Sequence, residues 1–349
     1  MMNRRNITIA ALAGGAAIYF LGSDTLSLSI VSMAVGLAIV VLIGEPMVEG
    51  LQEFSVYTGL SSHVTGIISS LASNLPEMMM TLFMISSPQL REVAILTVLL
   101  ASTFNGLLLG ILVIMVTWSG ATVELPRNAL VRDVEVMRLA IAFCMIVFGT
   151  GVILNMNCTG GSPTLPWEVP LFMLVGYLGY LFFVARGGKE GMKHVEHGDK
   201  SMGWVTPILL GLAGTLISAE LISGSSEHLV HMFDLHVVIA ATFIGFAGSV
   251  PEHGLALIGA RGGHVELGVS NLLSGIVQSI MLIFPVVALL VPVQLDGYVL
   301  YQFLAIAVTL WIVKKSIVDD GRLTLDEGVS IIVIYLLGVL LFDELSLLF

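Results

Sequence analysis

Long stretches of apolar residues, separated by short polar segments, run through the chain from its first residues to its last. A first apolar stretch lies within residues 1–22. Ten further apolar segments follow near residues 26–56, 61–87, 91–118, 134–154, 167–186, 203–231, 237–260, 265–292, 298–315 and 327–347. Most of them reach the roughly 20 residues that a helix needs to cross a bilayer. The pattern therefore predicts an all-α protein that crosses the membrane many times.

A polar segment near residues 187–202 divides these ten segments into two groups of five. An odd number of crossings ends on the other side of the membrane, so the two groups run in opposite orientations. Inverted repeats with a broken helix in each half are the architecture of many secondary transporters. We therefore predict a ten-helix core of two inverted five-helix repeats. Its parts are an extra N-terminal helix in residues 1–25, a first repeat in 26–187, a linker in 188–202 and a second repeat in 203–349.

Lysine and arginine residues predict the orientation of this core. If the first segment spans the membrane from the cytoplasm, thirteen of the 14 basic residues fall on the cytoplasmic side, and only Arg91 falls outside. Cytoplasmic loops of membrane proteins carry such an excess. The first segment also resembles a cleaved signal peptide, and its removal would leave the same orientation for the rest. We expect a multi-pass protein of the cell membrane, with a cytoplasmic N-terminus and an external C-terminus.

Composition agrees with this picture. Hydrophobic residues make up 56% of the chain and charged residues 11%, whereas soluble domains carry about 25% charged residues. The net charge of −11 comes mostly from acids near the ends of the apolar segments, and nothing indicates nucleic-acid binding. Cys144 and Cys158 do not have the spacing of a metal site. The expected partners are the lipid bilayer and small cations, with no protein partner evident.

Two polar motifs interrupt the apolar segments: ASNLPE at residues 72–77 and AGSVPE at residues 247–252. In each motif a proline directly precedes a glutamate. A proline inside a helix removes a backbone hydrogen bond, and in lipid the freed carbonyl must be satisfied by protein, water or an ion. A carboxylate within a span is costly and marks an ion or proton pathway by default. The recurrence of the motif predicts a duplicated unit, with Glu77 and Glu252 at one central site.

Glu77 and Glu252 are separated along the chain by a number of residues that we call the motif offset. The same offset separates other pairs of identical residues. They are Glu45 with Glu220, Leu60 with Leu235, Ala72 with Ala247, and Leu82 with Leu257. Glu45 and Glu220 therefore precede the two motif glutamates by equal distances along the chain, and His253 follows Glu252. Proton coupling or gating is a possible role for Glu45, Glu220 and His253. The alternatives are a wet helix face near the membrane surface for the glutamates and packing against a neighbouring span for the histidine.

Each Pro-Glu segment is followed by a segment that carries a side-chain amide. Asn105 follows Glu77 along the chain at nearly the same separation at which Gln278 follows Glu252. A helical hairpin would bring each amide to about the depth of its glutamate. The candidate ligands are Glu77, Glu252, Asn105, Gln278, Ser73, Asn74, Gly248, Ser249 and Ser274.

Such an all-oxygen site suits a hard cation, and six to eight oxygen ligands of flexible geometry suit Ca²⁺. Mg²⁺ fits less well because it loses its water reluctantly, and soft metals would need thiolates. Polar side chains within spans often only form hydrogen bonds between helices, which stays the alternative for Ser274.

The two motifs resemble the alpha repeats of the cation/Ca²⁺ exchanger superfamily. The segment from Ser73 to Glu77 is similar to the Gly-Thr-Ser-Leu-Pro-Glu signature of Na⁺/Ca²⁺ exchangers, and Asn105 with the preceding Phe matches their Phe-Asn. His253, after the second glutamate, and Gln278, where sodium exchangers usually carry Asp, resemble Ca²⁺/H⁺ exchangers instead. The resemblance implies alternating access, in which the first and sixth core helices slide past the Pro-Glu helices.

The expected function is secondary-active antiport of Ca²⁺, or a similar cation, in exchange for H⁺. Two carboxylates balance one Ca²⁺ or two protons, and burial beside a second carboxylate raises a carboxyl pKa. Na⁺/Ca²⁺ exchange by the same site stays open, because backbone carbonyls can hold Na⁺. A passive cation channel is a more remote alternative. No enzymatic activity and no cofactor are expected, since no metalloenzyme motif such as His-Glu-x-x-His is present.

Overall fold

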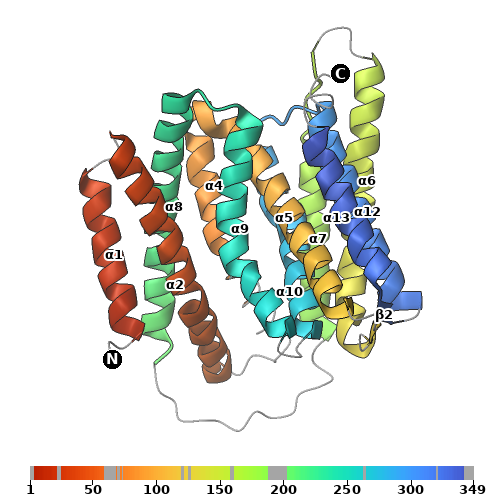
Figure 1. The fold of residues 1–349 in the computed structure, drawn as a ribbon, viewed down its shortest axis with the longest axis horizontal. Helices are drawn as coiled ribbons and strands as arrows, with labels where there is room; N and C mark the ends of the chain where they lie inside the picture. The colour runs from red at the N-terminus through yellow and green to blue at the C-terminus, as the bar shows by residue number, and fades with distance from the viewer. Residues whose placement is uncertain are drawn as a thin grey trace. The chain divides into compact units, whose positions relative to one another are not determined.

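The computed structural model describes residues 4–21, 25–58, 68, 71, 72, 74–118, 122–124, 127–157, 161–187, 203–261, 265–319 and 321–341. Within these residues the chain is mostly helical (Figure 1). The first half forms α1 (Arg4–Leu21), α2 (Leu26–Thr58), α4 (Leu75–Ser86), η1 (Pro88–Leu90), α5 (Arg91–Thr117), β1 (Val123–Glu124), α6 (Arg127–Asn157) and α7 (Glu168–Gly187). The second half forms α8 (Val205–Phe233), α9 (Val237–Arg261), α10 (Val265–Gln278), the π-helix η3 (Ser279–Ile283), α11 (Phe284–Leu290), α12 (Gly297–Asp319), β2 (Arg322–Leu323) and α13 (Leu325–Leu340).

Apolar helices long enough to cross a membrane confirm the predicted all-α, multi-pass fold. Among the described residues six stretches meet that standard: Leu26–Ser55, Pro88–Thr117, Val134–Asn157, Val205–Phe233, Gly268–Leu290 and Gly297–Ser316. Shorter apolar stretches occur in α1, α4, α7 and α9. Most of the predicted span at 61–87 before α4 lies outside the described residues, so the count of ten core helices stays a prediction.

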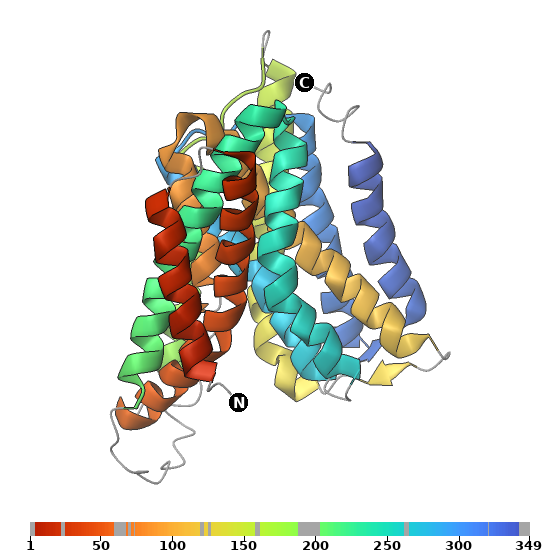
Figure 2. The ribbon, with the colours of Figure 1, turned by 60° about the vertical axis from the view of Figure 1, so that its left-hand side comes forward.

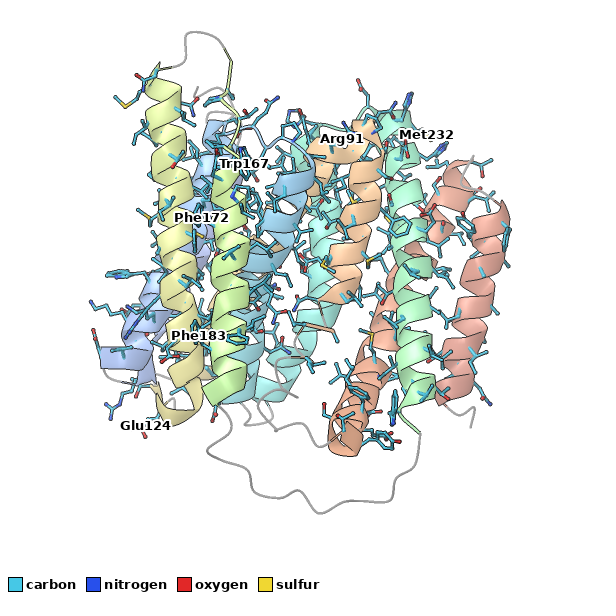
Figure 3. All side chains as sticks on the ribbon, turned by 180° about the vertical axis from the view of Figure 1, so that it is seen from behind. Arg91, Glu124, Trp167, Phe172, Phe183 and Met232 are labelled. Carbon is cyan, nitrogen blue, oxygen red and sulfur yellow. The ribbon has the colours of Figure 1, made fainter. Side chains whose placement is uncertain are left out.

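Large apolar side chains on the outer helix faces fit a lipid environment. Trp167, Phe172 and Phe183 lie along α7 or directly before it, and all are more than half exposed (Figure 3). A soluble protein would bury most side chains of this size. The exposed side of α7 is therefore suited to contact lipid acyl chains.

The helices gather into two compact units that do not follow the sequence halves. One unit contains Met1–Ala94 and Leu178–Gly248, and the other contains Ile95–Tyr177 and Ser249–Phe349. Each unit takes helices from both halves, which is what interleaved repeats produce. The repeat boundaries predicted from the sequence are a different division of the chain and stay a prediction.

In the first unit, α2 and α8 pack along their length in opposite directions. Gly36 near the start of α2 lies against Ile222 late in α8, whereas Phe54 near the end of α2 stacks edge-on against Trp204, which directly precedes α8. The ring centroids of this aromatic pair are 4.9 Å apart. These are the first core helices of the two halves, so their antiparallel packing confirms the prediction that the halves are inverted.

The contacts between α2 and α8 are also copies of each other. A Cβ atom at Gly36 would lie 2.8 Å from the Cγ1 of Ile222, and a Cβ atom at Gly211 would lie 2.7 Å from the Cβ of Met47. The motif offset relates Gly36 to Gly211, and it also relates Met47 to Ile222. Small residues let helices approach closely in membranes. One glycine-to-large-side-chain contact therefore occurs twice, related by the same offset as the Pro-Glu motifs.

Helix α1 packs on both members of this pair (Figures 1 and 2). Leu12 forms a buried cluster with Ile39 and Ile43 of α2 and Leu221 of α8, and Gly15 lies against Ile39. A retained N-terminal helix requires such packing. A cleaved signal peptide would leave this face of α2 and α8 uncovered.

In the second unit, α6 and α12 form another antiparallel pair of equivalent helices, the fourth of each half. Asn155 near the end of α6 donates its side-chain N–H to the carbonyl of Leu295, just before α12, at 2.8 Å. At the opposite ends, β1 pairs with β2 in antiparallel register, and Arg322 forms a 3.2 Å ion pair with Glu124. The inverted arrangement thus appears in both units.

A cap at the start of α12 gives a pH-dependent prediction. The Asp296 carboxylate accepts a hydrogen bond from the backbone N–H of Val299 at 2.7 Å. Burial raises the pKa of Asp296 above its ordinary value, although the backbone N–H groups of Val299 and Tyr298 lower it in part. Between the unfolded and the folded pKa, the folded state holds a proton that the unfolded state has lost. The free energy of unfolding therefore rises as pH falls through the folded pKa.

We expect Asp296→Asn to keep the cap and remove this pH dependence, because an amide oxygen accepts the same hydrogen bond without titrating. Asp296→Ala should lower the free energy of unfolding by about 1 kcal/mol at neutral pH, as helix N-caps do. Thermal unfolding of the detergent-solubilised protein between pH 4 and pH 7 measures both effects. Equal pH profiles for wild type and Asp296→Asn would contradict the assignment.

Candidate cation site

The first Pro-Glu motif forms the beginning of a helix. Asn74 occupies the N-cap of α4, and Pro76 lies in the first turn, where a missing backbone N–H leaves no broken hydrogen bond. The prediction that this proline lies inside a helix is wrong, because α4 begins at Leu75. Glu77 consequently sits in the first turn, where the helix dipole favours negative charge.

Glu77 is buried at this position, with only 5% of its surface exposed, and Asn74 is 2% exposed. The Thr81 hydroxyl donates to the backbone carbonyl of Glu77 at 2.8 Å, and the Met78 N–H donates to the Asn74 carbonyl at 3.1 Å. A buried carboxylate in an apolar helix needs a positive charge or a proton to be stable. Glu77 therefore has the setting of an ion-binding or proton-binding group.

One residue of the second motif approaches α4 within the first unit. A Cβ atom at Gly248 would lie 3.4 Å from the terminal methyl group of Met80, which is one helical turn after Glu77. Gly248 is the second residue of AGSVPE. The beginning of the second motif therefore lies against the helix that carries the first glutamate.

The second motif differs from the first because α9 continues from Val237 to Arg261 through Pro251. The break expected in the second half is absent, since a proline removes a single hydrogen bond and a helix can continue around it. Ser249 is 1% exposed, and its hydroxyl has no hydrogen-bond partner among the described residues. Ser73 and the side chains of Glu252 and His253 lie outside the described residues.

Asn105 is fully buried in α5, and neither its amide oxygen nor its amide nitrogen has a hydrogen-bond partner within the described part of the chain. Its neighbours in the helix are held firmly. The Thr103 hydroxyl lies 2.7 Å from the side-chain oxygen of Gln302 in α12, and the ring of Tyr335 in α13 packs directly on Gly106. A buried unpaired amide is costly and calls for an explanation. An oxygen ligand for a cation provides one.

Gln278 ends α10 and is 4% exposed. Its side-chain nitrogen donates to the Ser274 hydroxyl oxygen at 2.9 Å, which fixes the orientation of the amide. The π-helix η3 follows at once and ends before Pro285, a residue that cannot donate a backbone hydrogen bond. π-helical turns inside α-helices are frequent at functional sites.

Comparison with known proteins identifies the family. The family model described as sodium/calcium exchanger protein matches residues 28–186 and 204–342, one range in each half. The chain belongs to this family. The resemblance inferred from the Pro-Glu motifs is therefore confirmed, and the family is one of transporters.

Solved structures support the fold of this exchanger family member. The H⁺/Ca²⁺ exchanger CAX matches with a TM-score of 0.73 at 15% identity, over 97% of this chain and 89% of that one. The native YfkE structure matches with a TM-score of 0.65 at 16% identity, over 98% and 100%. The sodium-calcium exchanger NCX_Mj gives 0.62 at 16% identity, over 90% and 99%. No curated protein matches the chain by sequence.

Other predicted site residues of the exchanger are only partly accounted for. Glu220 is half-buried in α8, and Glu45 lies in α2 with its side chain outside the described part. Among the described residues, no group of three or more His, Cys, Asp or Glu side chains could hold a metal ion.

Three features of the exchanger were not predicted from its sequence. Gln302 holds α5 beside Asn105, and a polar residue in an apolar span was the signal. The Gly36 and Gly211 pair follows the motif offset. Glu227 in α8 accepts a hydrogen bond from the Ser87 hydroxyl at 2.9 Å, which ties α8 to the end of α4. Nothing in the local sequence indicates that last contact.

Proposed function

We propose that this exchanger moves Ca²⁺ across the membrane in exchange for H⁺ by alternating access. The observation that carries the proposal is Glu77, a carboxylate 5% exposed in the first turn of an apolar helix. A bound cation or a proton offsets the cost of burying such a group, so one site exchanges the two. The buried amide of Asn105 supports an oxygen-ligand site for a hard cation.

Charge balance favours H⁺ as the counter-ion. We propose that Glu77 and Glu252 supply two negative charges, while Asn105 and Gln278 are neutral. Ser73, Asn74, Gly248, Ser249 and Ser274 are the proposed neutral ligands. One Ca²⁺ or two protons neutralise two carboxylates, whereas several Na⁺ ions would leave excess positive charge. Uncompensated charge in a protein interior costs several kcal/mol in order of magnitude.

Alternating access also requires a part of the protein that moves. We propose that the antiparallel α2–α8 pair slides past the Pro-Glu helices, with Glu45, Glu220 and His253 as candidates for gating or proton coupling. The basic residues favour a cytoplasmic N-terminus and an external C-terminus in the cell membrane.

The decisive experiment is Ca²⁺ flux into proteoliposomes that contain the purified exchanger. A pH gradient alone should drive Ca²⁺ uptake, and an equal Na⁺ gradient at constant pH should not. Vigorous uptake under the Na⁺ gradient with no response to pH would replace the proposal with Na⁺/Ca²⁺ exchange. The likeness of Ser73–Glu77 to the sodium-exchanger signature makes that the second candidate. Currents far above transporter turnover would indicate a channel.

Gln278→Asp tests the charge argument directly. The added carboxylate should let Na⁺ compete with Ca²⁺ and should weaken coupling to the pH gradient, because it supplies the charge that several Na⁺ ions need. Ca²⁺ uptake against rising Na⁺ at fixed pH measures the competition. Gln294→Asp adds the same charge on an exposed loop residue and serves as the control. Equal Na⁺ inhibition of wild type, control and Gln278→Asp would show that charge count does not select the counter-ion.

A further inference from the structure

Buried hydroxyl groups in these helices usually donate to a carbonyl one turn earlier. Thr117 donates to Val113 at 2.6 Å, and Thr215 donates to Gly211 at 2.9 Å. Thr97 in α5 is an exception to this pattern. Its side chain is fully buried, and its hydroxyl has no hydrogen-bond partner among the described residues.

Two other buried Ser or Thr hydroxyls in the described chain share this condition, Ser249 and Thr309. Ser249 belongs to the second Pro-Glu motif, and Thr309 has the Tyr335 hydroxyl as a neighbour. The roles of both are therefore accounted for. Thr97 belongs to neither motif, and none of the described side chains forms a hydrogen bond with its hydroxyl.

The position of Thr97 relates it to the proposed site. Thr97, Ala101 and Asn105 follow one another at intervals of four residues, so they lie along one side of α5. Thr97 and Asn105 are about 12 Å apart along the helix axis. Both present fully buried polar atoms with no hydrogen-bond partner in the described part of the chain, and the small Ala101 lies between them.

In the second half of the chain, the corresponding amide, that of Gln278, has a hydroxyl partner. Gln278 has a serine four residues earlier, and its amide donates to that hydroxyl. Asn105 has Ala101 in that position, so the first half lacks this hydroxyl one turn before its amide. Ser102, three residues before Asn105, already donates its hydroxyl to the carbonyl of Val98 at 3.4 Å. The next buried hydroxyl toward the start of α5 on this side is that of Thr97.

Stability does not explain the Thr97 hydroxyl. An unpaired buried hydroxyl costs roughly 1–3 kcal/mol, and valine would fill the same space without that cost. A chain keeps such a group where something other than the fold uses it. The oxygen atoms of Thr97 and Asn105 are of the kind that Ca²⁺ and its water molecules prefer.

We propose that Thr97 is a further residue of the transport path, resting on the proposed function of Ca²⁺ antiport. Its hydroxyl oxygen contacts the cation, or a water molecule bound to it, as the ion moves to or from Asn105. A neutral oxygen suits this role because it offsets part of the dehydration cost and still releases the ion.

The test compares Thr97→Val, Thr97→Ser and Thr117→Val in proteoliposomes. Thr97→Val should raise the KM for Ca²⁺ about threefold to tenfold, the usual effect of one lost hydrogen bond or ligand oxygen. Thr97→Ser keeps the hydroxyl and should stay near wild type. Thr117→Val is the matched control, a buried threonine of the same helix whose hydroxyl is already bonded within the helix. It should leave the KM unchanged.

Thermal stability separates transport from folding. Because Thr97 makes no hydrogen bond to a described residue, Thr97→Val should unfold at the wild-type temperature or above it. Direct contact with the ion should change the ratio of the KM values for Ca²⁺ and Sr²⁺, whereas contact through water should raise both by the same factor. A wild-type KM in Thr97→Val, or a raised KM accompanied by lower thermal stability, would overturn the inference.

Failure of the proposed function would give a different result. In that case the wild-type protein itself transports no Ca²⁺ under either gradient. Calorimetric titration of the purified variants with Ca²⁺ then decides the role of Thr97. Weaker binding in Thr97→Val than in wild type and Thr117→Val supports it, and equal or absent binding in all three rejects it.

Discussion

Glu77→Gln is expected to lower Ca²⁺ transport more than a hundredfold, and Glu252→Gln should do the same. Glu77 is buried in the first turn of α4, and glutamine keeps its shape but removes its charge. Removing one partner of a buried charge pair typically costs about 3–5 kcal/mol, and a hundredfold loss corresponds to about 2.8 kcal/mol. Initial rates of Ca²⁺ uptake in proteoliposomes measure the effect.

Both variants should remain folded and extractable, because neither removes packing volume. Glu53→Gln in α2 is a suitable control, since it removes an exposed carboxylate from another helix of the same unit. Size-exclusion profiles and unfolding temperatures check that the proteins are intact. Near-normal transport by either Glu77→Gln or Glu252→Gln would remove the central claim of a carboxylate-based cation site.

Cross-linking α4 to α8 is expected to arrest transport by more than tenfold in the linked fraction, a change of at least about 1.4 kcal/mol in the barrier. The Ser87 hydroxyl and the Glu227 carboxylate are 2.9 Å apart, so cysteines at these positions are within reach of a short, reducible bifunctional thiol reagent. A link there ties the proposed sliding helix to a Pro-Glu helix. Uptake before and after addition of the reagent, and again after reduction, measures the arrest.

A matched link within the sliding pair should be tolerated. Phe54 in α2 and Trp204, directly before α8, are in ring contact, so cysteines at these positions would link α2 to α8. These two helices are proposed to move together. Both double-cysteine variants need a background without Cys144 and Cys158. Full transport by a protein linked between positions 87 and 227 would show that α8 does not slide past α4. Arrest by the link between positions 54 and 204 would show that α2 and α8 move separately.

The sequence predicts the membrane fold and its inversion because apolar length and motif repetition are local or periodic signals. The motif offset that pairs Glu77 with Glu252 also pairs Gly36 with Gly211, whose contacts join the two halves. Inversion was therefore predictable before any contact was known. The confirmed antiparallel packing of α2 with α8 is its direct structural counterpart.

The two prolines show what local signals cannot predict. Pro76 lies at the start of α4, whereas Pro251 lies within the continuous α9. A proline removes a backbone hydrogen bond only inside a helix, and the surrounding packing decides whether a helix begins at the proline or continues through it. The setting of Asn105 was equally out of reach, because Gln302 and Tyr335 come from helices far along the chain. The residues near Asn105 in the sequence do not indicate that Gln302 and Tyr335 pack beside it.

The copied contacts between α2 and α8 have an energetic consequence for the resting protein. If the α2–α8 pair moves and has internal two-fold symmetry, it presents equivalent surfaces in the two end states of its movement. Those end states would then be nearly equal in free energy. Among the described helices, α1 has no counterpart in the second half, and Leu12 joins it to both members of the pair. Any difference in its packing between the end states biases their populations, by a factor of ten for about every 1.4 kcal/mol. In the proposed mechanism, the packing of this unmatched helix would set the side to which the empty transporter opens at rest.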